Sequence, residues 1–265
     1  MRKPVFFAAL FALITGILSS ASAQSGNFTI AQNGKSVGTA NFNFTSTPRG
    51  YASTSVVHLD MKGLTYSLSK TETLSSANHL RRVQVSATLN NVAVNVTGAP
   101  DAAAGQFLLT VLAGGTSSTA RLAPHPGAVF LPDFDPGALE TLLALAVANN
   151  NRNLWAIIPK QITGPDGTVQ AGSIASVVLA TYADEQGTLD SQPITVHHLV
   201  ANIAGAKTQI FSGPDNQLLQ AELPQSGFAL VRDGFVLTPP AKPGAPPVQP
   251  PPAAAPAAST APLQQ

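Results

Sequence analysis

The sequence predicts a mainly β protein in which a curved antiparallel sheet forms an unclosed half-barrel around one principal α-helix. Apolar and polar residues alternate along most of the chain, turn-forming pairs separate these runs at short intervals, and one segment has helical spacing. Because such strands bury only one face, that face needs a cover. The alternative architecture is a two-sheet β-sandwich with the helix capping one end.

The alternation begins at residues 27–31 and returns over residues 40–45. Between them, Asn33 and Gly34 form a pair suited to a tight hairpin turn, because both tolerate positive φ. Asn90 and Asn91 predict a second hairpin tip. Alternating runs predict further strands near 64–69, 83–89, 92–96, 106–113, 116–123, 153–159, 168–182, 193–204, 207–212, 217–223 and 227–232. Short, turn-rich connections favour antiparallel neighbours.

The helix is predicted near 136–149. Pro136 suits the first helical position, and the carboxylate of Asp135 can accept hydrogen bonds from the free amides of the first turn. An apolar stripe follows at helical spacing and needs a concave partner. Its members are Leu139, Leu142, Leu143 and Ala146.

The chain divides into three parts. Residues 1–23 carry two basic residues, a short apolar run and an Ala-Ser-Ala ending, which is typical of a secretory signal peptide. Residues 24–238 form the antiparallel β domain. Residues 239–265 hold 10 of the 22 prolines and predict a disordered tail. We therefore expect a periplasmic or secreted bacterial protein without a transmembrane anchor.

Composition excludes several classes of function. The chain has no cysteine, which rules out disulfides and thiolate chemistry. Its 14 Lys and Arg residues nearly balance 13 Asp and Glu residues, so no basic field favours nucleic acid.

No enzyme motif stands out, and we expect no catalytic residue, no metal site and no cofactor. Ser67 and Lys70 match the S-x-x-K pattern, but on a strand they point to opposite faces. His197 and His198 are adjacent on a strand and cannot converge on one metal. His58 and Asp60 share a strand face and are the only motivation for the alternative of an unrecognised hydrolase.

The leading functional prediction is a non-enzymatic protein that binds an apolar ligand, such as a lipid or an acylated partner protein, in a cleft between sheet and helix. Another alternative is a cell-envelope module with a filled core, which meets a protein or glycan, with the tail as a possible contact. The predicted ligand-binding residues are Phe42, Phe44, Tyr66, Leu139, Leu142, Leu143 and Trp155.

Four segments carry a family resemblance: residues 26–30, 33–39, 217–224 and 227–232. They resemble the opening and closing hairpins of a group of uncharacterised exported bacterial proteins. That group has an unclosed-barrel layout similar to the lipoprotein-carrier (LolA/LolB-like) architecture. The resemblance implies a half-barrel around helices and an apolar ligand, and it implies no catalytic residue.

Overall fold

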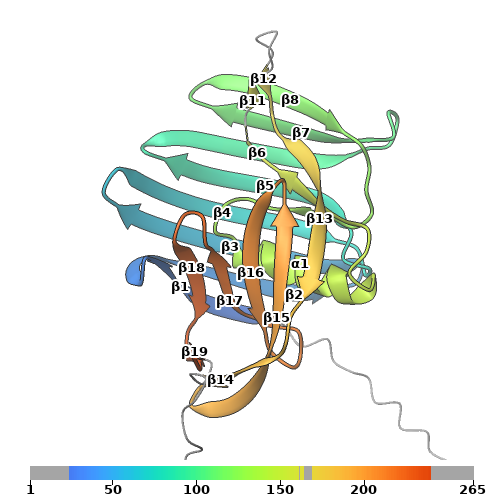
Figure 1. The fold of residues 1–265 in the computed structure, drawn as a ribbon. Coiled ribbons are helices and arrows are strands. Elements are labelled where there is room, and N and C mark those ends of the chain that lie inside the picture. The colour runs from blue at the N-terminus through green and yellow to red at the C-terminus, as the bar shows by residue number, and fades with distance from the viewer. Residues whose placement is uncertain (1–23, 161, 164–168, 240–265) are drawn as a thin grey trace, which may run out of the picture.

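The computed structural model describes residues 24–160, 162–163 and 169–239 (Figure 1). The predicted signal peptide, and the predicted tail apart from Pro239, lie outside the described residues. Most of the described strands belong to one 17-stranded sheet, whose ladders are antiparallel except for one.

The first half of the sheet is a meander in which each strand pairs with the next. Its strands are β1 (Ser25–Gln32), β2 (Lys35–Thr47), β3 (Gly50–Met61), β4 (Leu64–Leu74), β5 (Leu80–Leu89), β6 (Val92–Asp101), β7 (Gln106–Ala113) and β8 (Thr116–Leu122). Asn33 and Gly34 have φ values of 49° and 78°, and Asn90 and Asn91 have values of 47° and 66°. Both predicted hairpin turns are therefore confirmed.

The second half of the sheet starts from the other edge of β1. Its strands are β9 (Ala128–Phe130), β10 (Leu154–Ile158), β13 (Ser173–Thr181), β14 (Glu185–Leu189), β15 (Gln192–Ile203), β16 (Ala206–Ser212), β17 (Leu218–Leu223), β18 (Phe228–Arg232) and β19 (Phe235–Leu237). β18 pairs with β1, and the ladders continue through β17, β16, β15, β13 and β10 to β9, which is parallel to β10. β14 and β19 extend the sheet beside β15.

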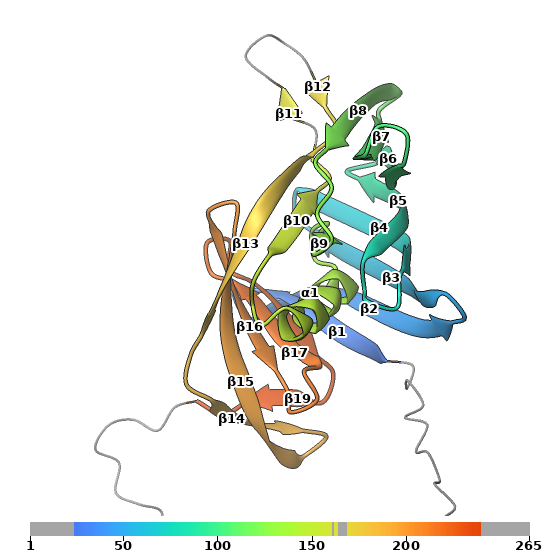
Figure 2. The ribbon, with the colours of Figure 1, turned by 90° about the vertical axis from the view of Figure 1, so that its right-hand side faces the viewer.

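The sheet does not close on itself. Within the described ranges, no ladder joins β8 to β9, so the sheet stays open between these two strands. Figure 2 shows the two halves curving around a central space that holds the helix. The predicted unclosed, mainly antiparallel sheet around one helix is confirmed.

The helix α1 (Pro136–Ala148) forms where predicted. Asp135 is its N-cap and accepts from the amides of Gly137 and Ala138, and Pro136 occupies the first turn. Asn149 is its C-cap, followed by Asn150 and Asn151 at positive φ. α1 is buried on nearly every side, and it packs against β2, β3, β9, β10 and β17.

One predicted strand was wrong in its extent. The run 168–182 is interrupted, because β12 (Val169–Gln170) belongs to a two-stranded sheet with β11 (Ile162–Thr163), and β13 starts only at Ser173. Gly172 lies between them, where a side chain would come within 2.5 Å of the Ile158 carbonyl oxygen and 2.8 Å of Leu109. The backbone at this point approaches its neighbours too closely to continue an ordinary strand.

Candidate functional site

An apolar hollow, here called the concave pocket, lies on the inner face of β4–β7. Its volume is about 360 Å³. The segments that follow β9 and β10 form its opposite wall. Its lining residues are Tyr66, Leu68, Val85, Ala87, Leu89, Val94, Val96, Val111, Ala113, Phe130, Leu131, Pro132, Asp133, Ile158, Pro159 and Lys160.

Strand alternation and register explain why these residues meet. Every second residue of each strand points inward. The ladders then place Ala87 opposite Val94, Val94 opposite Ala113, and Val96 opposite Val111. Two of these positions are alanine, whose small side chains leave space above the sheet. The pocket is therefore a consequence of small residues at inward positions.

Three polar side chains stand among the lining residues: Tyr66, Asp133 and Lys160. Burial, helped by the negative charges of Asp133 and Asp135, raises the pKa of the Tyr66 phenol, so it stays protonated and can donate a hydrogen bond. Asp133 is exposed, yet desolvation by the surrounding walls raises the pKa of its carboxyl group, and the charge of Lys160 opposes that rise. Lys160 is exposed.

Phe134 connects this pocket to the helix. Its φ of 59° turns the chain between Asp133 at the pocket and Asp135 in the core. The Phe134 ring lies 6.3 Å from the Tyr66 ring and packs edge-on against Phe228 at 4.8 Å. These ring contacts hold the loop that carries Asp133.

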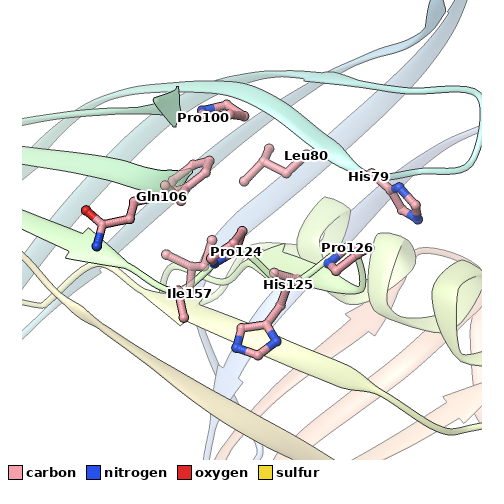
Figure 3. Close-up of a pocket in the computed structure, with 11 residues that line it drawn as sticks. His79, Leu80, Pro100, Gln106, Pro124, His125, Pro126 and Ile157 are labelled. Atoms are coloured by element: carbon pink, nitrogen blue, oxygen red, sulfur yellow. The ribbon is translucent and has the colours of Figure 1, made fainter. Parts of the chain in front are cut away.

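A second, smaller pocket of about 220 Å³ lies toward the other end of β5–β7. The rings of His79 and His125 lie apart in it (Figure 3), and the His125 ring stacks on Trp155 at 3.8 Å between centroids. Its lining residues are His79, Leu80, Pro100, Gln106, Phe107, Ala123, Pro124, His125, Pro126, Ala128 and Ile157.

Of the predicted ligand-binding residues, the structure brings only Tyr66 into the concave pocket. Phe42 is 2% exposed in the core and packs edge-on against Phe44 at 5.5 Å. Trp155 lies on β10 against His125. The three leucines of α1 (Leu139, Leu142 and Leu143) are buried in the core, and Leu143 also reaches a groove of about 310 Å³ at the C-terminal end of the helix.

The sequence analysis missed the small and β-branched residues of β5–β7 that line the concave pocket. Their signal was present at one end of these strands, where the inward phase carries alanine and valine, whereas the same phase at the other end of β7 carries Phe107 and Leu109. Small residues at inward positions indicate unfilled space, provided that nothing larger reaches in from elsewhere.

A group of buried polar residues, here called the ion cluster, lies beneath the first turn of α1. Lys70 contacts Glu72 at 3.0 Å (Nζ to Oε2) and also contacts Oδ2 of Asp135. On the neighbouring strand β3, Ser53 lies opposite Glu72 and Ser55 lies opposite Lys70. Burial is the main cause that raises the pKa of Glu72, although Lys70 opposes it. The pKa of Lys70 is also raised, because its two carboxylate neighbours outweigh its own desolvation.

Glu140 is a further buried carboxyl group of α1. Its Oε2 accepts from the Leu218 amide at 2.7 Å, and its Oε1 accepts from the Gln24 side chain. Burial raises the pKa of Glu140 to about 7, against the opposing effects of the Leu218 amide, Arg232 and Gln24. Glu140 thus attaches the helix to β17 and to the residue that precedes β1.

The serine–lysine and histidine motifs considered from the sequence lie apart from both pockets. Ser67 and Lys70 lie on opposite faces of β4, and His58 and Asp60 are exposed on the outer face of β3. His197 pairs with Asp184 at 3.0 Å, whereas His198 pairs with Glu185 at 2.9 Å and stacks between Tyr182 and Phe211. In the part of the chain that the structure describes, no cluster of three or more His, Asp or Glu residues could hold a metal ion. None of the described helices is long and apolar enough to span a membrane.

Comparison with solved structures finds a similar fold in a protein of unknown function. The chain resembles the crystal structure of a β-barrel-like protein of the domain of unknown function DUF1849 from Brucella abortus, with a TM-score of 0.50. The likeness covers 82% of this chain and 98% of that chain at 9% sequence identity, so it shows the fold alone. No family model matches the chain. No curated protein matches it either.

Proposed function

We propose that the protein binds the apolar chain of an amphipathic ligand, such as an acyl chain, in the concave pocket. The observation that carries this proposal is a hollow of about 360 Å³ lined mainly by apolar side chains. This volume is within the range of roughly 300–1,000 Å³ that is usual for small-molecule sites. Leu89, which lines the pocket, is 44% exposed and would be covered by such a ligand.

Burial of apolar surface would supply the affinity. Each methylene group removed from water contributes about 0.8 kcal/mol, and no other interaction is needed along a hydrocarbon chain. Affinity should therefore rise with chain length until the pocket is filled, and the protein should accept chains of several structures. Once the pocket is filled, the protein would discriminate between ligands by the length of their hydrocarbon chain.

The polar side chains at the pocket suit the head of the ligand. Lys160 offers a positive charge, and Tyr66 offers a hydroxyl donor. Asp133 beside them would disfavour a head group with two negative charges more strongly than one with a single charge. A carboxylate or a neutral ester fits this arrangement best.

The predicted signal peptide and the resemblance to lipoprotein-carrier layouts support a place outside the cytoplasm, where the acyl chain belongs to a free lipid or to an acylated protein. The absence of an enzyme motif in the sequence supports binding without chemistry. Export, a non-enzymatic role and an acylated partner are parts of the same proposal.

Filling the pocket tests the proposal. Ala87→Trp and Ala113→Trp would put an indole into the space above β5 and β7. Ala93→Trp is the matched control, because Ala93 is exposed on neighbouring β6 and does not line the pocket. Binding of dansyl-labelled undecanoic acid would be followed by fluorescence, and lipid that co-purifies would be identified by native mass spectrometry.

We expect both filling variants to weaken binding at least about tenfold, the equivalent of about 1.4 kcal/mol, and the control to bind like the wild type. Equal binding by all four proteins would show that the probe binds elsewhere. A wild-type protein that takes up no probe and carries no lipid would refute the proposal.

A further inference from the structure

The ion cluster is sealed from solvent in a way that no binding role explains. The side chains of Lys70 and Asp135 are 0% exposed, and that of Glu72 is 1% exposed. Ser53 and Ser55, which complete the cluster, are 0% and 1% exposed. None of the five residues lines the concave pocket.

As a set of ions, the cluster leaves much of its hydrogen-bonding capacity unused. Lys70 Nζ contacts Oε2 of Glu72 and Oδ2 of Asp135. Among the described residues, neither Nζ nor Oδ2 nor either oxygen of Glu72 has a hydrogen bond of normal geometry. The two serine hydroxyls also lack a partner there. Buried ion pairs offset their desolvation only when good geometry and further hydrogen bonds accompany them. One positive and two negative groups in a dry core are therefore a costly final state.

We propose that Lys70 and Asp135 become joined by an amide bond between Nζ and Cγ, with Glu72 as the group that transfers the protons. A primary amine held against a carboxyl group, sealed from solvent and next to a second carboxyl group, has the arrangement that condensation requires. The reaction needs no oxidant, reductant or cofactor. It is a self-modification of the folded chain and is independent of the proposed ligand binding.

The atoms of this reaction balance. The ammonium group of Lys70 gives a proton to Glu72, and the freed electron pair of Nζ forms the bond to Cγ of Asp135. Glu72 relays two of the three Nζ protons to Oδ2, the Cγ–Oδ2 bond breaks, and Oδ2 leaves as water. The third proton stays on the amide nitrogen, and Glu72 is again a carboxylate. Two opposite charges have disappeared, and the net charge of the cluster is unchanged.

The N-terminus of α1 supplies the hydrogen-bond donors that stabilise negative charge on Asp135 during the reaction. Oδ1 of Asp135 accepts from the amides of Gly137 at 2.9 Å and Ala138 at 3.3 Å. These donors face the oxygen on which negative charge develops while Cγ is tetrahedral. They remain partners of the amide carbonyl in the product, and the new N–H lies beside Glu72. The polar groups of the amide product therefore have better hydrogen-bond partners than the buried ions have.

The bond would connect β4 to the N-cap of the helix. In a chain without cysteine, it would provide the covalent brace that exported proteins often obtain from disulfides. Its two ends are far apart in sequence, so it would also limit how far the unfolded chain can expand.

Peptide mapping of the full chain decides the question. Trypsin cannot cleave after an amide-linked Lys70, so we expect a branched peptide that joins residues 63–81 to residues 122–152, lighter than their sum by one water molecule. Loss of water from the intact mass is not enough, because a succinimide at Asp166 and Gly167 would give the same mass. Fragment ions of the branched peptide identify the linked residues.

Two variants complete the test. Glu72→Gln keeps the size of the side chain but cannot relay protons, and we expect the separate peptides 63–70 and 122–152. Lys160→Arg, the matched control at an exposed lysine, should retain the branched peptide. Separate peptides from the wild-type protein would overturn the proposal, whether or not the variants fold. A branched peptide in equal yield from Glu72→Gln would overturn the part assigned to Glu72.

Discussion

The concave face of the sheet has two regions with different packing. In the region over β1–β3, which α1 covers, inward side chains such as Phe28, Phe42, Val57 and Leu59 are only 0–2% exposed. At the end of β5–β7 that borders the concave pocket, the inward residues Ala87, Val94 and Ala113 remain partly exposed, whereas Val83 and Leu109 on the same strands are 0% exposed. One continuous sheet therefore carries a filled core and an open pocket.

The length of the helix explains this difference. α1 has 13 residues and is about 20 Å long. It packs against β2 and β3, whereas β9, β10 and the segments that follow them lie opposite β5–β7 (Figure 2). A single short helix cannot fill a large half-barrel. We infer that stability depends on the covered region and ligand binding on the open one.

The largest effect should come from truncating a large side chain in the covered region. Phe42→Ala should lower the free energy of unfolding by about 4 kcal/mol, because it leaves a cavity among tightly packed side chains. Val94→Ala in the open region should cost about 1 kcal/mol or less, since the removed methyl groups border a hollow. Urea unfolding followed by circular dichroism measures both values. Equal losses would contradict the distinction between the two regions.

The next effect concerns pH and belongs to the covered region. The pKa of Glu140 is about 7 in the folded protein and 4.5 in its ordinary state, so the folded chain binds more protons between these values. The free energy of unfolding should therefore fall as the pH rises from about 4.5 to about 7, by roughly 3 kcal/mol, and then level off.

Glu140→Gln isolates this contribution, because glutamine keeps an acceptor for the Leu218 amide and cannot ionise. Urea unfolding at several pH values should show a smaller slope for the variant than for the wild type. Parallel pH profiles for the two proteins would show that Glu140 is not the responsible group.

A smaller effect of opposite sign is expected at the border between the regions. Ser53 is fully buried, and its hydroxyl has no hydrogen-bond partner among the described residues. Ser53→Ala should raise the free energy of unfolding by about 1 kcal/mol, because an unsatisfied buried hydroxyl is removed. Thr54→Ala, at the exposed position next along β3, is the control and should change little. Thermal unfolding compares the three proteins, and a destabilised Ser53→Ala would reveal an unrecognised partner.

The smallest effect should affect binding and leave stability unchanged. Lys160→Ala removes an exposed charge at the pocket, which should weaken binding of dansyl-labelled undecanoic acid about twofold to fivefold. The melting temperature should stay the same. The dansyl-labelled methyl ester, which has no charge, should bind both proteins alike. A similar loss for the ester would show that Lys160 acts through packing.

Local signals predicted much of the fold. The Asn33–Gly34 turn and the Asp135 cap depend on neighbouring residues only, and both formed as expected. The unclosed sheet followed from alternation combined with the presence of one helix. The close approach at Gly172 depends on segments that are distant in sequence, and the interruption of the predicted strand 168–182 could not be anticipated.

The sites were harder to predict than the fold. The apolar stripe of α1 suggested a cleft beside the helix, but its leucines are buried in the core, and the hollow lies over β5–β7. The ion cluster was missed because it needs the register of β3 with β4 and the return of the chain at Asp135. One sequence signal was available, since Lys70 and Glu72 occupy the same inward phase as Leu68 and Leu74.

The pairing of β1 with β18 determines the order in which the chain can be completed. Phe28 lies opposite Arg232, so the first described strand is bonded to one of the last. In the meander from β2 to β8 the ladders join successive strands, and these ladders form quickly because short loops connect them. The second half cannot join β1 until nearly the whole chain is available. During synthesis from the N-terminus, β1 must therefore wait with one edge open, and a chain shortened before β18 would keep that edge exposed to aggregation.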